Sequence, residues 1–518
     1  MNITFIPLDE FRARMEALRG QGFDFLRDMV GMDWGEEGLG AIYLLENSAT
    51  RENIRVAART TDREHPSMPT VSDIWLVANI YEREVFDFFG IIFKGHPYLH
   101  RIFLRNDWVG YPLRKDYDES EAVNPVRMFS ESNEKDFYHT VEEDGSVQLH
   151  PDDQFEDNEY VINIGPQHPA THGVLRFRLS LEGEFINKVD VHCGYIHRGI
   201  EKMSEKLTYP QILGLTDRLD YLSAHQNRHA LCMCIEKAMG IEVSDRVQYI
   251  RTIMDELQRI DSHLLFFSCL CMDLGALTAF FYGFRDREKI LDIFEATTGG
   301  RLIQNYNTIG GVQYDIAPDF VQKVKEFIAY LRPMLREYHE VFTGNVIANG
   351  RLKGVGVLSR EDAISFGATG GTGRASGWAC DVRKRHPYAM YGKVDFKEII
   401  RTEGDCFARY MVRMEEIMES MNIIEQLIDN IPEGPFQEKT KAIIKVPEGS
   451  YYAAVEGSRG EFGVFLESRG DKYPYRLKFR STGLPLVSIM ETVCRGAKIA
   501  DLIAIGGTVD YVVPDIDR

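Results

Sequence analysis

The 518-residue chain is 44% hydrophobic and 27% charged, which is typical of globular proteins with two or three domains. Its net charge of −19 disfavours nucleic-acid binding, because phosphate contacts need clustered Lys and Arg. Its eight cysteines contain no Cys-x-x-Cys pair, so no disulfide framework and no intrinsic zinc or iron–sulfur site is expected, and a reducing, cytosolic location fits.

The first 117 residues predict a small α/β domain. Apolar spacing indicates a helix over 8–19, strands near 23–32, 41–46 and 53–60, and a second helix over 71–90. The segment 96–117 mixes aromatic and basic residues with two prolines that interrupt regular structure. We expect this segment to form an interface rather than to contribute to a core.

Residues 118–159 have a different composition. They contain 14 acidic and 2 basic residues and few apolar ones, so most of the excess negative charge lies here. This composition predicts an extended or partly disordered linker, and its length suggests that two separate units have been joined.

From residue 160 a small antiparallel sheet is predicted to lead into a mostly helical region, which makes the chain α+β. We expect strands at 160–164, 174–181, 354–357, 451–455, 463–468 and 475–479. Helices are expected at 198–215, 245–272, 286–297 and 396–431, with a further helix ending at 239. The Gly-rich stretch 367–373 is expected to be a loop, and it lacks the Lys-Ser/Thr of a P-loop.

The apolar stretch 263–284 is nearly long enough to span a bilayer. Asp273 lies in its middle, and charges at helical spacing flank it on both sides. We therefore expect a buried core helix, in which an ionisable Asp is a candidate functional residue.

Two histidines lie in a stiff loop between the strands at 160–164 and 174–181. The loop sequence GPQHPATHG carries His168 and His172, and its Gly and Pro residues stop either strand from continuing. A histidine can donate a proton near neutral pH, and a rigid loop fixes where that donor points. The alternative is that one or both histidines only cap backbone groups.

Further polar residues are embedded in apolar helical sequence. Taken singly, each is more often a hydrogen-bonded core group. Together with the two loop histidines they predict a proton-handling cavity between a loop and a helical bundle. No Ser-His-Asp spacing or nucleophile elbow supports hydrolysis. These residues are Arg218, Asp220, Tyr221, Glu256, Arg259, His263 and Asp273.

Longer motifs resemble a known family. The 49 kDa subunit of respiratory complex I is similar to the stretches GPQHPATHGVLR, GYIHRGIEK, TDRLDYLS, SHLLFFSCLCMDLGALTAFF, GGTGRASGWACDVRKRHPY and VPDIDR. The 30 kDa subunit of that enzyme is similar to DFFGIIFKGHPYLHRI and DWVGYPLRKDY. Their order resembles the fused C/D subunits of bacterial NADH–quinone oxidoreductase. The resemblance implies a 30 kDa-like domain over 1–117, the linker over 118–159 and a 49 kDa-like domain over 160–518.

The 49 kDa family is related to the large subunit of nickel–iron hydrogenases, which implies a similar fold and a competing activity. Hydrogenases hold nickel and iron with two Cys-x-x-Cys pairs. The corresponding positions here are Asp220 and Ser223 in one pair, and Val512 and Asp515 in the other. Without these thiolates we do not expect metal-centred hydrogen chemistry. The resemblance implies that the vacated cavity binds a quinone headgroup.

The resemblance also implies roles for individual residues. His172 and Tyr221 would hydrogen-bond the quinone carbonyls, and Asp273 would pair with His172, which makes these three the implied catalytic residues. Donors at both carbonyls stabilise the oxyanions that two-electron reduction creates. His168 would also bind the quinone, and Arg218 would lie near the terminal iron–sulfur cluster. Supporting roles are implied for Asp220, Glu256, Arg259, His263, Arg374 and Asp381.

The implied protein is the quinone-site subunit of a proton-pumping NADH–quinone oxidoreductase, peripheral at the cytoplasmic face of the cell membrane. Quinone is its substrate, and the chain alone binds no cofactor or metal. The implied partners are the small subunit that holds the terminal cluster, other peripheral-arm subunits, and a membrane subunit at the entrance of the quinone channel. That cluster would pass electrons to the quinone, which this chain would protonate.

One departure from the family concerns the cluster. This chain has Ile303 and Thr308 where the family commonly has a histidine and an arginine. Fewer positive or protonatable groups should lower the cluster's potential and weaken its pH dependence, which predicts a low-potential quinone such as menaquinone. Two alternatives stay open: a different electron donor such as ferredoxin, and a structural subunit with a vestigial cavity.

Overall fold

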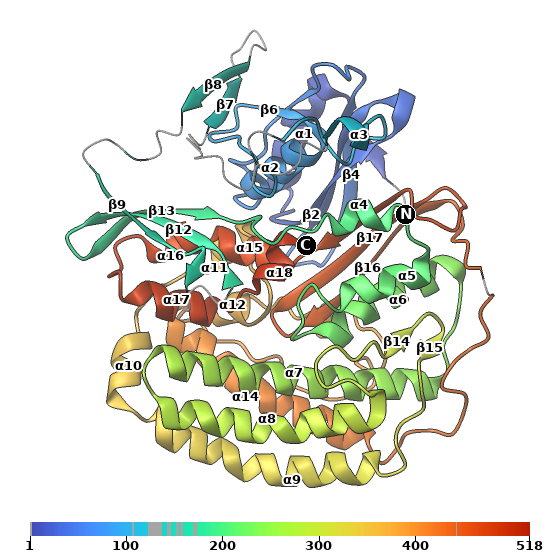
Figure 1. Cartoon of the computed structure of the whole chain (residues 1–518), viewed down its shortest axis with the longest axis vertical. Coiled ribbons are helices and arrows are strands. Elements are labelled where there is room, and N and C mark those ends of the chain that lie inside the picture. Colours follow the sequence, from blue (N-terminus) through green and yellow to red (C-terminus); the bar gives the residue numbers. More distant parts are fainter. Residues whose placement is uncertain are drawn as a thin grey trace.

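A computed structural model of the chain describes residues 3–105, 108–122, 137–141, 147–151, 155, 159–168, 173–441 and 443–518. The N-terminal part lies at one end of the molecule, and long helices lie at the other end, with two sheets between them (Figure 1). Within these described residues, no helix has the length and apolar character needed to cross a membrane. The mixture of sheets and helices confirms the predicted α+β class.

The N-terminal sheet has the strand order β1–β4–β3–β2. Only β1 and β4 are parallel, so the predicted α/β domain is a mainly antiparallel sheet. Two helices cover one face, where Met15, Tyr43 and Phe89 belong to one core. The elements are β1 (Thr4–Phe5), α1 (Leu8–Gly20), β2 (Phe25–Asp33), β3 (Leu39–Glu46), β4 (Asn53–Thr60), β5 (Ser67–Pro69), α2 (Ala78–Phe89) and β6 (Ile92–Lys94).

Helix α2 begins seven residues later than the sequence predicts. Tertiary contacts hold residues 71–77 in another conformation: the backbone N–H groups of Leu76 and Val77 donate to Ser365, and that of Val71 donates to the Glu82 carboxylate. Because these partners satisfy the backbone groups, the apolar periodicity alone does not extend the helix.

The second face of the N-terminal sheet is also buried. Val30 and Ile42 from this face share a core with Tyr452 and Phe465 of the C-terminal sheet. Arg480 reaches across the boundary and donates from its Nε to the backbone oxygen of residue 27 at 2.8 Å. The N-terminal part therefore packs directly against the C-terminal sheet, in addition to being covalently connected to it.

Segment 96–117 forms an interface within the chain, as predicted. The Phe103 ring stacks on His197 with centroids 5.4 Å apart, and Lys115 pairs with Glu205 at 2.9 Å. The expectation that the segment stays out of the core is wrong, because apolar side chains anchor it there: Leu99, Ile102, Phe103 and Leu113.

Most of the predicted linker lies outside the described residues. Its described elements are α3 (Glu119–Ala122) and the hairpin of β7 (Phe137–Val141) and β8 (Val147–Pro151). Beyond it, a three-stranded antiparallel sheet has the order β13–β12–β9, which confirms the strands predicted at 160–164 and 174–181. Its members are β9 (Tyr160–Ile164), β12 (Arg176–Glu182) and β13 (Phe185–His192), with the short hairpin β10 (Gln167–His168) and β11 (Gly173–Val174) between β9 and β12.

The helical region is built around the 29-residue α7, which packs against α8 and α14 (Figure 1). The apolar stretch 263–284 is divided between α7 and α8 by a turn at 274–276. The elements are α4 (Ile200–Ser204), α5 (Tyr209–Thr216), α6 (Ala224–Met239), α7 (Asp245–Asp273), α8 (Leu277–Thr298), β14 (Asn307–Thr308), β15 (Gly311–Val312), α9 (Phe320–Tyr338), α10 (Val346–Leu352), α11 (Arg360–Ser365), α12 (Gly370–Ala375), α13 (Val382–Arg385) and α14 (Cys406–Leu427).

Several predicted boundaries in this region are wrong. The helix predicted at 198–215 is two helices, because Thr208 and Gln211 form a capping box with Pro210 at the start of α5. The helix predicted at 396–431 begins only at Cys406, where the Asp405 side chain accepts from the N–H of residue 408. Helix α8 starts nine residues before the predicted one at 286–297, and α9 was not predicted.

The region around 354–373 also differs from the prediction. Residues 354–357 form turns rather than a strand, and the Gly-rich stretch contains the start of α12. The three C-terminal strands are confirmed and form an antiparallel sheet in the order β16–β17–β18. The remaining elements are β16 (Gly449–Gly457), β17 (Gly460–Ser468), β18 (Arg476–Arg480), α15 (Gly483–Ser488), α16 (Met490–Cys494), α17 (Asp501–Val509) and α18 (Val513–Asp517).

Candidate functional site

The polar residues of the loop between α5 and α6 differ in their exposure to solvent. Arg218 is exposed, Asp220 is buried and Tyr221 is half-buried. The Asp220 carboxylate accepts from the N–H of Leu222 at 3.0 Å and pairs with Arg459 at 3.1 Å. These two contacts anchor the loop from inside, so that Tyr221 is held at the boundary between core and surface.

The environment of Tyr221 favours a protonated phenol. Burial raises its pKa, the Arg459 guanidinium opposes that shift, and the Asp220 carboxylate and Cys269 thiol add to it. A phenol with a raised pKa keeps its proton at neutral pH. Tyr221 is therefore a hydrogen-bond donor in the free protein.

Asp273 ends helix α7 one turn after Cys269 and is half-buried. Burial raises the pKa of Cys269 to about 11, and the charges of Asp273 and Asp510 contribute to that shift. Since the Cys269 thiol also affects the pKa of Tyr221, the end of α7 and the Tyr221 loop face the same region. The structure thus brings two of the three predicted catalytic residues to one region of the molecule.

The β10–β11 hairpin reaches this region from a third element. A Cβ added at Gly165 would lie 2.0 Å from the backbone oxygen of Leu175, and one at Gly173 would lie 2.5 Å from Val513 on α18. Both positions therefore require glycine, because neighbouring atoms leave no room for a side chain. The hairpin packs directly on α18 through Gly173. His168 is exposed on β10. His172, the remaining predicted catalytic residue, lies outside the described residues.

Asp515 on α18 is held by hydrogen bonds close to the Tyr221 loop. Asp515 accepts from the N–H of Gly483 at 2.7 Å and from the hydroxyls of Ser481 and Thr482, both at 2.9 Å. Burial raises the pKa of Asp515, and the Asp220 carboxylate adds to the shift. Asp220 and Asp515, two positions at which the predicted hydrogenase resemblance expects thiolates, are therefore near each other, and both carboxylates are bonded within the protein.

The predicted supporting residues form a network with one another beneath the Tyr221 loop. Glu256 pairs with Arg259 at 3.2 Å, and His263 Nε2 lies 2.8 Å from Glu416. Arg374 pairs with the same Glu416 at 2.9 Å. The network contains five of the predicted supporting residues and three residues that were not predicted, and all eight are buried. The network comprises Glu256, Arg259, His263, Arg374, Asp381, Arg383, Glu416 and Glu456.

Glu416 is the centre of this network. Burial by itself would raise its pKa, but Arg374, His263 and Arg383 outweigh burial and hold the pKa well below its usual range. Burial lowers the pKa of His263, which the Glu416 carboxylate opposes. Paired buried charges of this kind fix the relative positions of the helices that carry them.

The sequence did not identify Arg383, Glu416, Glu456 or Arg459 as members of the site. Arg383 lies inside the long motif that resembles the 49 kDa family, and Glu416 lies on α14 among methionines. Arg459 occupies the tight turn between β16 and β17. Each of these four could have been noticed in the sequence, because an ionisable residue stands in an otherwise apolar or Gly-rich element.

The β16–β17 turn connects the network to the Tyr221 loop. Arg259 donates to the backbone oxygens of Glu456 and Gly457 at 2.8 and 2.9 Å. Two residues later, Arg459 bridges Asp220 and Asp510, both at 3.1 Å. The buried charges therefore support Tyr221 through one turn and do not contact it themselves.

A cavity lined by described residues lies elsewhere in the molecule. It has a volume of about 490 Å³, and neither Tyr221 nor Asp273 lines it. Within the part of the chain that the structure describes, no three His, Cys, Asp or Glu side chains are arranged to hold a metal ion.

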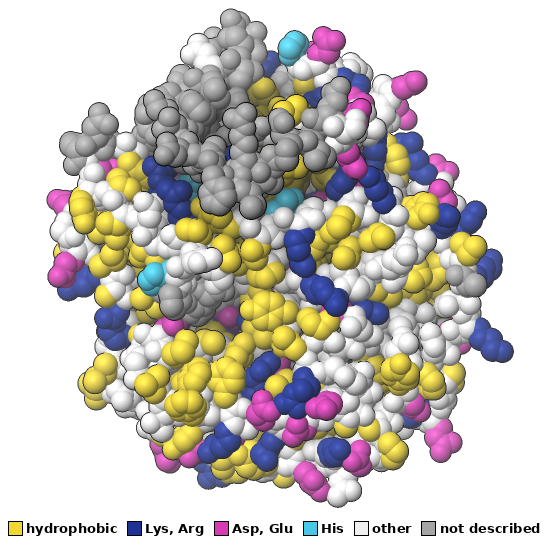
Figure 2. All heavy atoms as spheres, viewed as in Figure 1, with side chains coloured by type: hydrophobic (Ala, Val, Ile, Leu, Met, Phe, Trp, Pro, Cys, Tyr) yellow, Lys and Arg dark blue, Asp and Glu magenta, His cyan; other side chains and the backbone are white. Residues whose placement is uncertain are grey.

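The end of α7 near the candidate site carries exposed apolar side chains. Met272 is 40% exposed, and Leu277 and Phe281 at the start of α8 are 58% and 62% exposed. Figure 2 shows hydrophobic side chains gathered on the face that displays the ends of α7, α8 and α10. Exposed apolar groups of this density are typical of contact surfaces.

Comparison with known proteins assigns both parts of the chain to families. Residues 5–123 match the 30 Kd subunit of respiratory-chain NADH dehydrogenase, and residues 273–445 and 440–518 match the 49 Kd subunit. The C/D subunit of NADH-quinone oxidoreductase from Phocaeicola vulgatus is 79% identical, with 99% of each chain covered. The protein of the same name from Bacteroides thetaiotaomicron is 70% identical over the whole chain and 99% of its own length.

Two other relatives each cover 71% of this chain. The D subunit of NADH-quinone oxidoreductase from Desulfotalea psychrophila is 47% identical over 71% of this chain and 98% of its own. A chain of the membrane-bound sulfane sulfur reductase, an archaeal respiratory membrane complex, has a TM-score of 0.68 and 34% identity over 71% of this chain and its whole length.

Proposed function

The chain belongs to the family of fused C/D subunits of NADH–quinone oxidoreductase, and from this premise we propose that it forms the quinone-reducing site of that enzyme. In the proposed reaction, electrons reach the quinone from an iron–sulfur cluster held by a neighbouring subunit. Protons come from Tyr221 and His172, with Asp273 paired to His172. The quinone is the substrate, and this chain contributes hydrogen-bond donors and proton carriers.

The observation that supports this proposal most is the convergence of three elements at Tyr221. The phenol keeps its proton because its pKa is raised, the end of α7 brings Asp273 to the same region, and the hairpin that leads into His172 packs on α18 beside them. A donor held by Asp220 and Arg459 stabilises the negative charge that develops on a quinone oxygen during reduction. The buried network keeps that donor in place.

Substitution of Tyr221 tests this role. We expect Tyr221→Phe to lower kcat for quinone reduction about 100-fold, because the ring stays but the proton donor is lost. The assay uses the assembled oxidoreductase, with cluster reduction by NADH followed separately. Tyr314→Phe, at a tyrosine that is 57% exposed, is the matched control. Near-normal quinone reduction by an assembled Tyr221→Phe enzyme would instead favour the structural subunit with a vestigial cavity.

The identity of the quinone is a finer proposal. Ile303 and Thr308 stand where the family commonly has a histidine and an arginine, so we propose a low-potential quinone, menaquinone. Ile303 lies in the turn after α8, and Arg301 beside it is engaged by Glu288, Asp292 and Glu295. Because three carboxylates engage Arg301, it adds little free positive charge near the proposed cluster position to raise the cluster's potential.

Redox titration of the terminal cluster at two pH values tests this proposal. We expect its midpoint potential to change by much less than about 59 mV per pH unit, because no histidine titrates beside it. Ile303→His should restore a slope near that value. A full one-proton slope in the unaltered enzyme would contradict the menaquinone proposal.

The proposed assembly follows from the same premise. Arg218 is exposed and therefore available to the cluster-bearing subunit, and the apolar ends of α7 and α8 are available to a membrane subunit. We propose that the chain is peripheral, at the cytoplasmic face of the membrane. The archaeal relative is named for a different acceptor, so the fold alone does not identify the redox partners of the chain. Ferredoxin is the second candidate for the electron donor. Co-purification of a flavin-bearing, NADH-oxidising subunit would distinguish the two. We also propose that the C-terminal part shares its fold with the large subunit of nickel–iron hydrogenases.

A further inference from the structure

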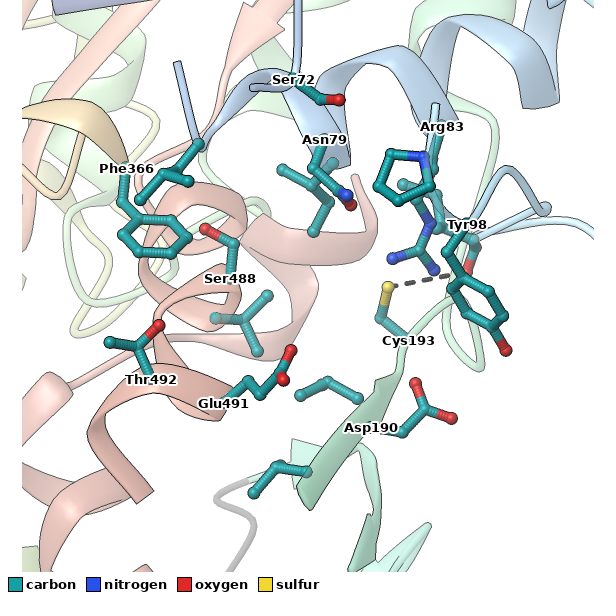
Figure 3. A pocket seen from close by; sticks show the side chains of 17 residues that line it. Ser72, Asn79, Arg83, Tyr98, Asp190, Cys193, Phe366, Ser488, Glu491 and Thr492 are labelled. Carbon is teal, nitrogen blue, oxygen red and sulfur yellow. Dashed lines mark hydrogen bonds between the residues drawn. The ribbon is translucent and has the colours of Figure 1, made fainter. Parts of the chain in front are cut away.

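A cavity lies where the N-terminal and C-terminal parts of the chain meet. Helix α2 and residues 97–102 form one side, and β13, α15 and α16 form the other (Figure 3). Its volume of about 490 Å³ falls within the range of about 300–1,000 Å³ for small-molecule sites. Most of its wall is apolar and comes from Leu76, Ile80, Val189, Val191, Phe366 and Val487.

One cation in the cavity, Arg83, forms no ion pair with any Asp or Glu oxygen of the described residues. Its guanidinium projects from α2 toward Cys193 across the cavity (Figure 3). Its Nη2 contacts His100 Nε2, while its Nε is buried without a hydrogen-bond partner in the described part of the chain. Burial and the Arg83 charge hold the pKa of His100 well below its usual range, so His100 is neutral and does not balance Arg83.

Two carboxylates line the cavity, and each lies close to another side chain with which it pairs. Asp190 lies 2.6 Å from His192 Nε2 and 3.5 Å from Arg178. Glu491 pairs with Arg495 at 2.6 Å. The Asp190 carboxylate also acts on the Arg83 charge but forms no ion pair with it. Arg83 therefore has no carboxylate of the described residues in direct contact, and an anionic occupant of the cavity could supply one.

Asn79 provides a second polar group on the same helix. It lies one turn before Arg83 on α2, and its side chain points into the cavity (Figure 3). An amide N–H and a guanidinium fork on one helical face can both donate to the oxygens of a carboxylate. The opposite wall is formed by apolar side chains, which suit a hydrocarbon body.

We propose that this cavity binds an organic anion, a carboxylate with an apolar body, whose charged end pairs with Arg83. The site is independent of the proposed quinone site, since none of its lining residues belongs to that site. Both parts of the chain form its walls, so the ligand bridges them and stabilises their packing.

Calorimetric titration of the purified full-length chain with decanoate and with decanol tests the site. The two probes share an apolar body and differ in charge. We expect decanoate to bind at least tenfold more tightly than decanol. Arg83→Gln should remove that preference, whereas Arg83→Lys should keep most of it. Arg14→Gln, which removes an exposed arginine of α1, should leave both affinities unchanged.

A second variant keeps the test decisive if Arg83→Gln does not fold. Leu76, at the cavity wall, is 37% exposed, so Leu76→Trp should fold and should weaken decanoate binding at least tenfold by filling the cavity. Equal affinity for the two probes, or decanoate binding that neither Arg83→Gln nor Leu76→Trp reduces, would overturn the proposal. Binding to the free chain but not to the assembled oxidoreductase would also overturn it, since a partner subunit would then cover the cavity.

Discussion

At the scale of single residues, buried carboxyl groups of this chain are held in two different protonation states. Glu416 has a strongly lowered pKa because three cationic side chains surround it. Glu82 is the opposite case: burial raises its pKa to about 8, although hydrogen bonds from Thr70 and Val71 oppose the shift. Partner charge, and not depth of burial, decides between the two outcomes.

The raised pKa of Glu82 predicts a pH-dependent effect on stability. A carboxyl group whose pKa is higher in the folded state contributes stability at low pH, which is lost as pH rises through about 8. We therefore expect the melting temperature of Glu82→Gln, relative to the unaltered chain, to increase between pH 5 and pH 9. Thermal unfolding at both pH values measures this, with the exposed Glu52→Gln as control. A difference that stays constant with pH would contradict the assignment.

At the scale of secondary-structure elements, the pairing of α7 with α8 depends on one small residue. A Cβ added at Gly283 on α8 would lie 2.0 Å from Ser268 Oγ and 3.0 Å from the backbone oxygen of Leu264 on α7. Glycine therefore permits the close approach of two helices that support Asp273. The same approach explains why a stretch long enough to suggest a membrane helix folds back on itself instead.

Gly283→Ala should destabilise the chain despite the higher helix propensity of alanine. We expect a loss of about 1–3 kcal/mol in the free energy of unfolding, because the added methyl group forces the helices apart. Gly214→Ala on α5 is the matched control, since nothing lies within 4 Å of its added Cβ, and should gain up to about 1 kcal/mol. Urea unfolding distinguishes the two. Equal stabilisation by both substitutions would show that the helices are not in tight contact.

At the scale of the whole molecule, buried ion pairs hold the N-terminal part on the C-terminal part. Glu84 on α2 pairs with Lys478 of β18 at 2.6 Å and with the terminal Arg518 at 2.5 Å. Both cations are nearly fully buried and come from the far end of the sequence. The fused chain thus behaves as one packed body in the regions that the structure describes.

Residues 1–117 and 160–518 should therefore associate when they are co-expressed as separate chains. We expect Glu84→Gln in the shorter chain to weaken that association at least tenfold, because two buried cations lose their partner. Glu16→Gln, at an exposed residue of α1, should leave it unchanged. Calorimetry or analytical ultracentrifugation measures the dissociation constant. Failure of the unaltered pair to associate would mean that the linker is needed for packing.

The sequence by itself determined the α+β class, the long helix α7, the family and eight of the strands: β2, β3, β4, β9, β12, β16, β17 and β18. Alternation of apolar residues and helical periodicity are local signals that the sequence carries by itself. The long motifs that resemble the family can also be compared without coordinates. The same local signals identified Tyr221, Asp273 and three members of the buried network as polar residues in apolar surroundings, and the family resemblance added Arg374 and Asp381.

Only the tertiary structure decided what those residues contact. Glu256 pairs with Arg383, which lies 127 positions away in the sequence. Helix α2 begins late because Ser365 accepts hydrogen bonds from the backbone N–H groups just before it. The cavity at Arg83 exists because α2 and β13 lie face to face, and no local pattern in either element records the other. Helix and strand periodicity arises from neighbouring residues, whereas pairing of buried charges depends on which distant elements the fold brings together.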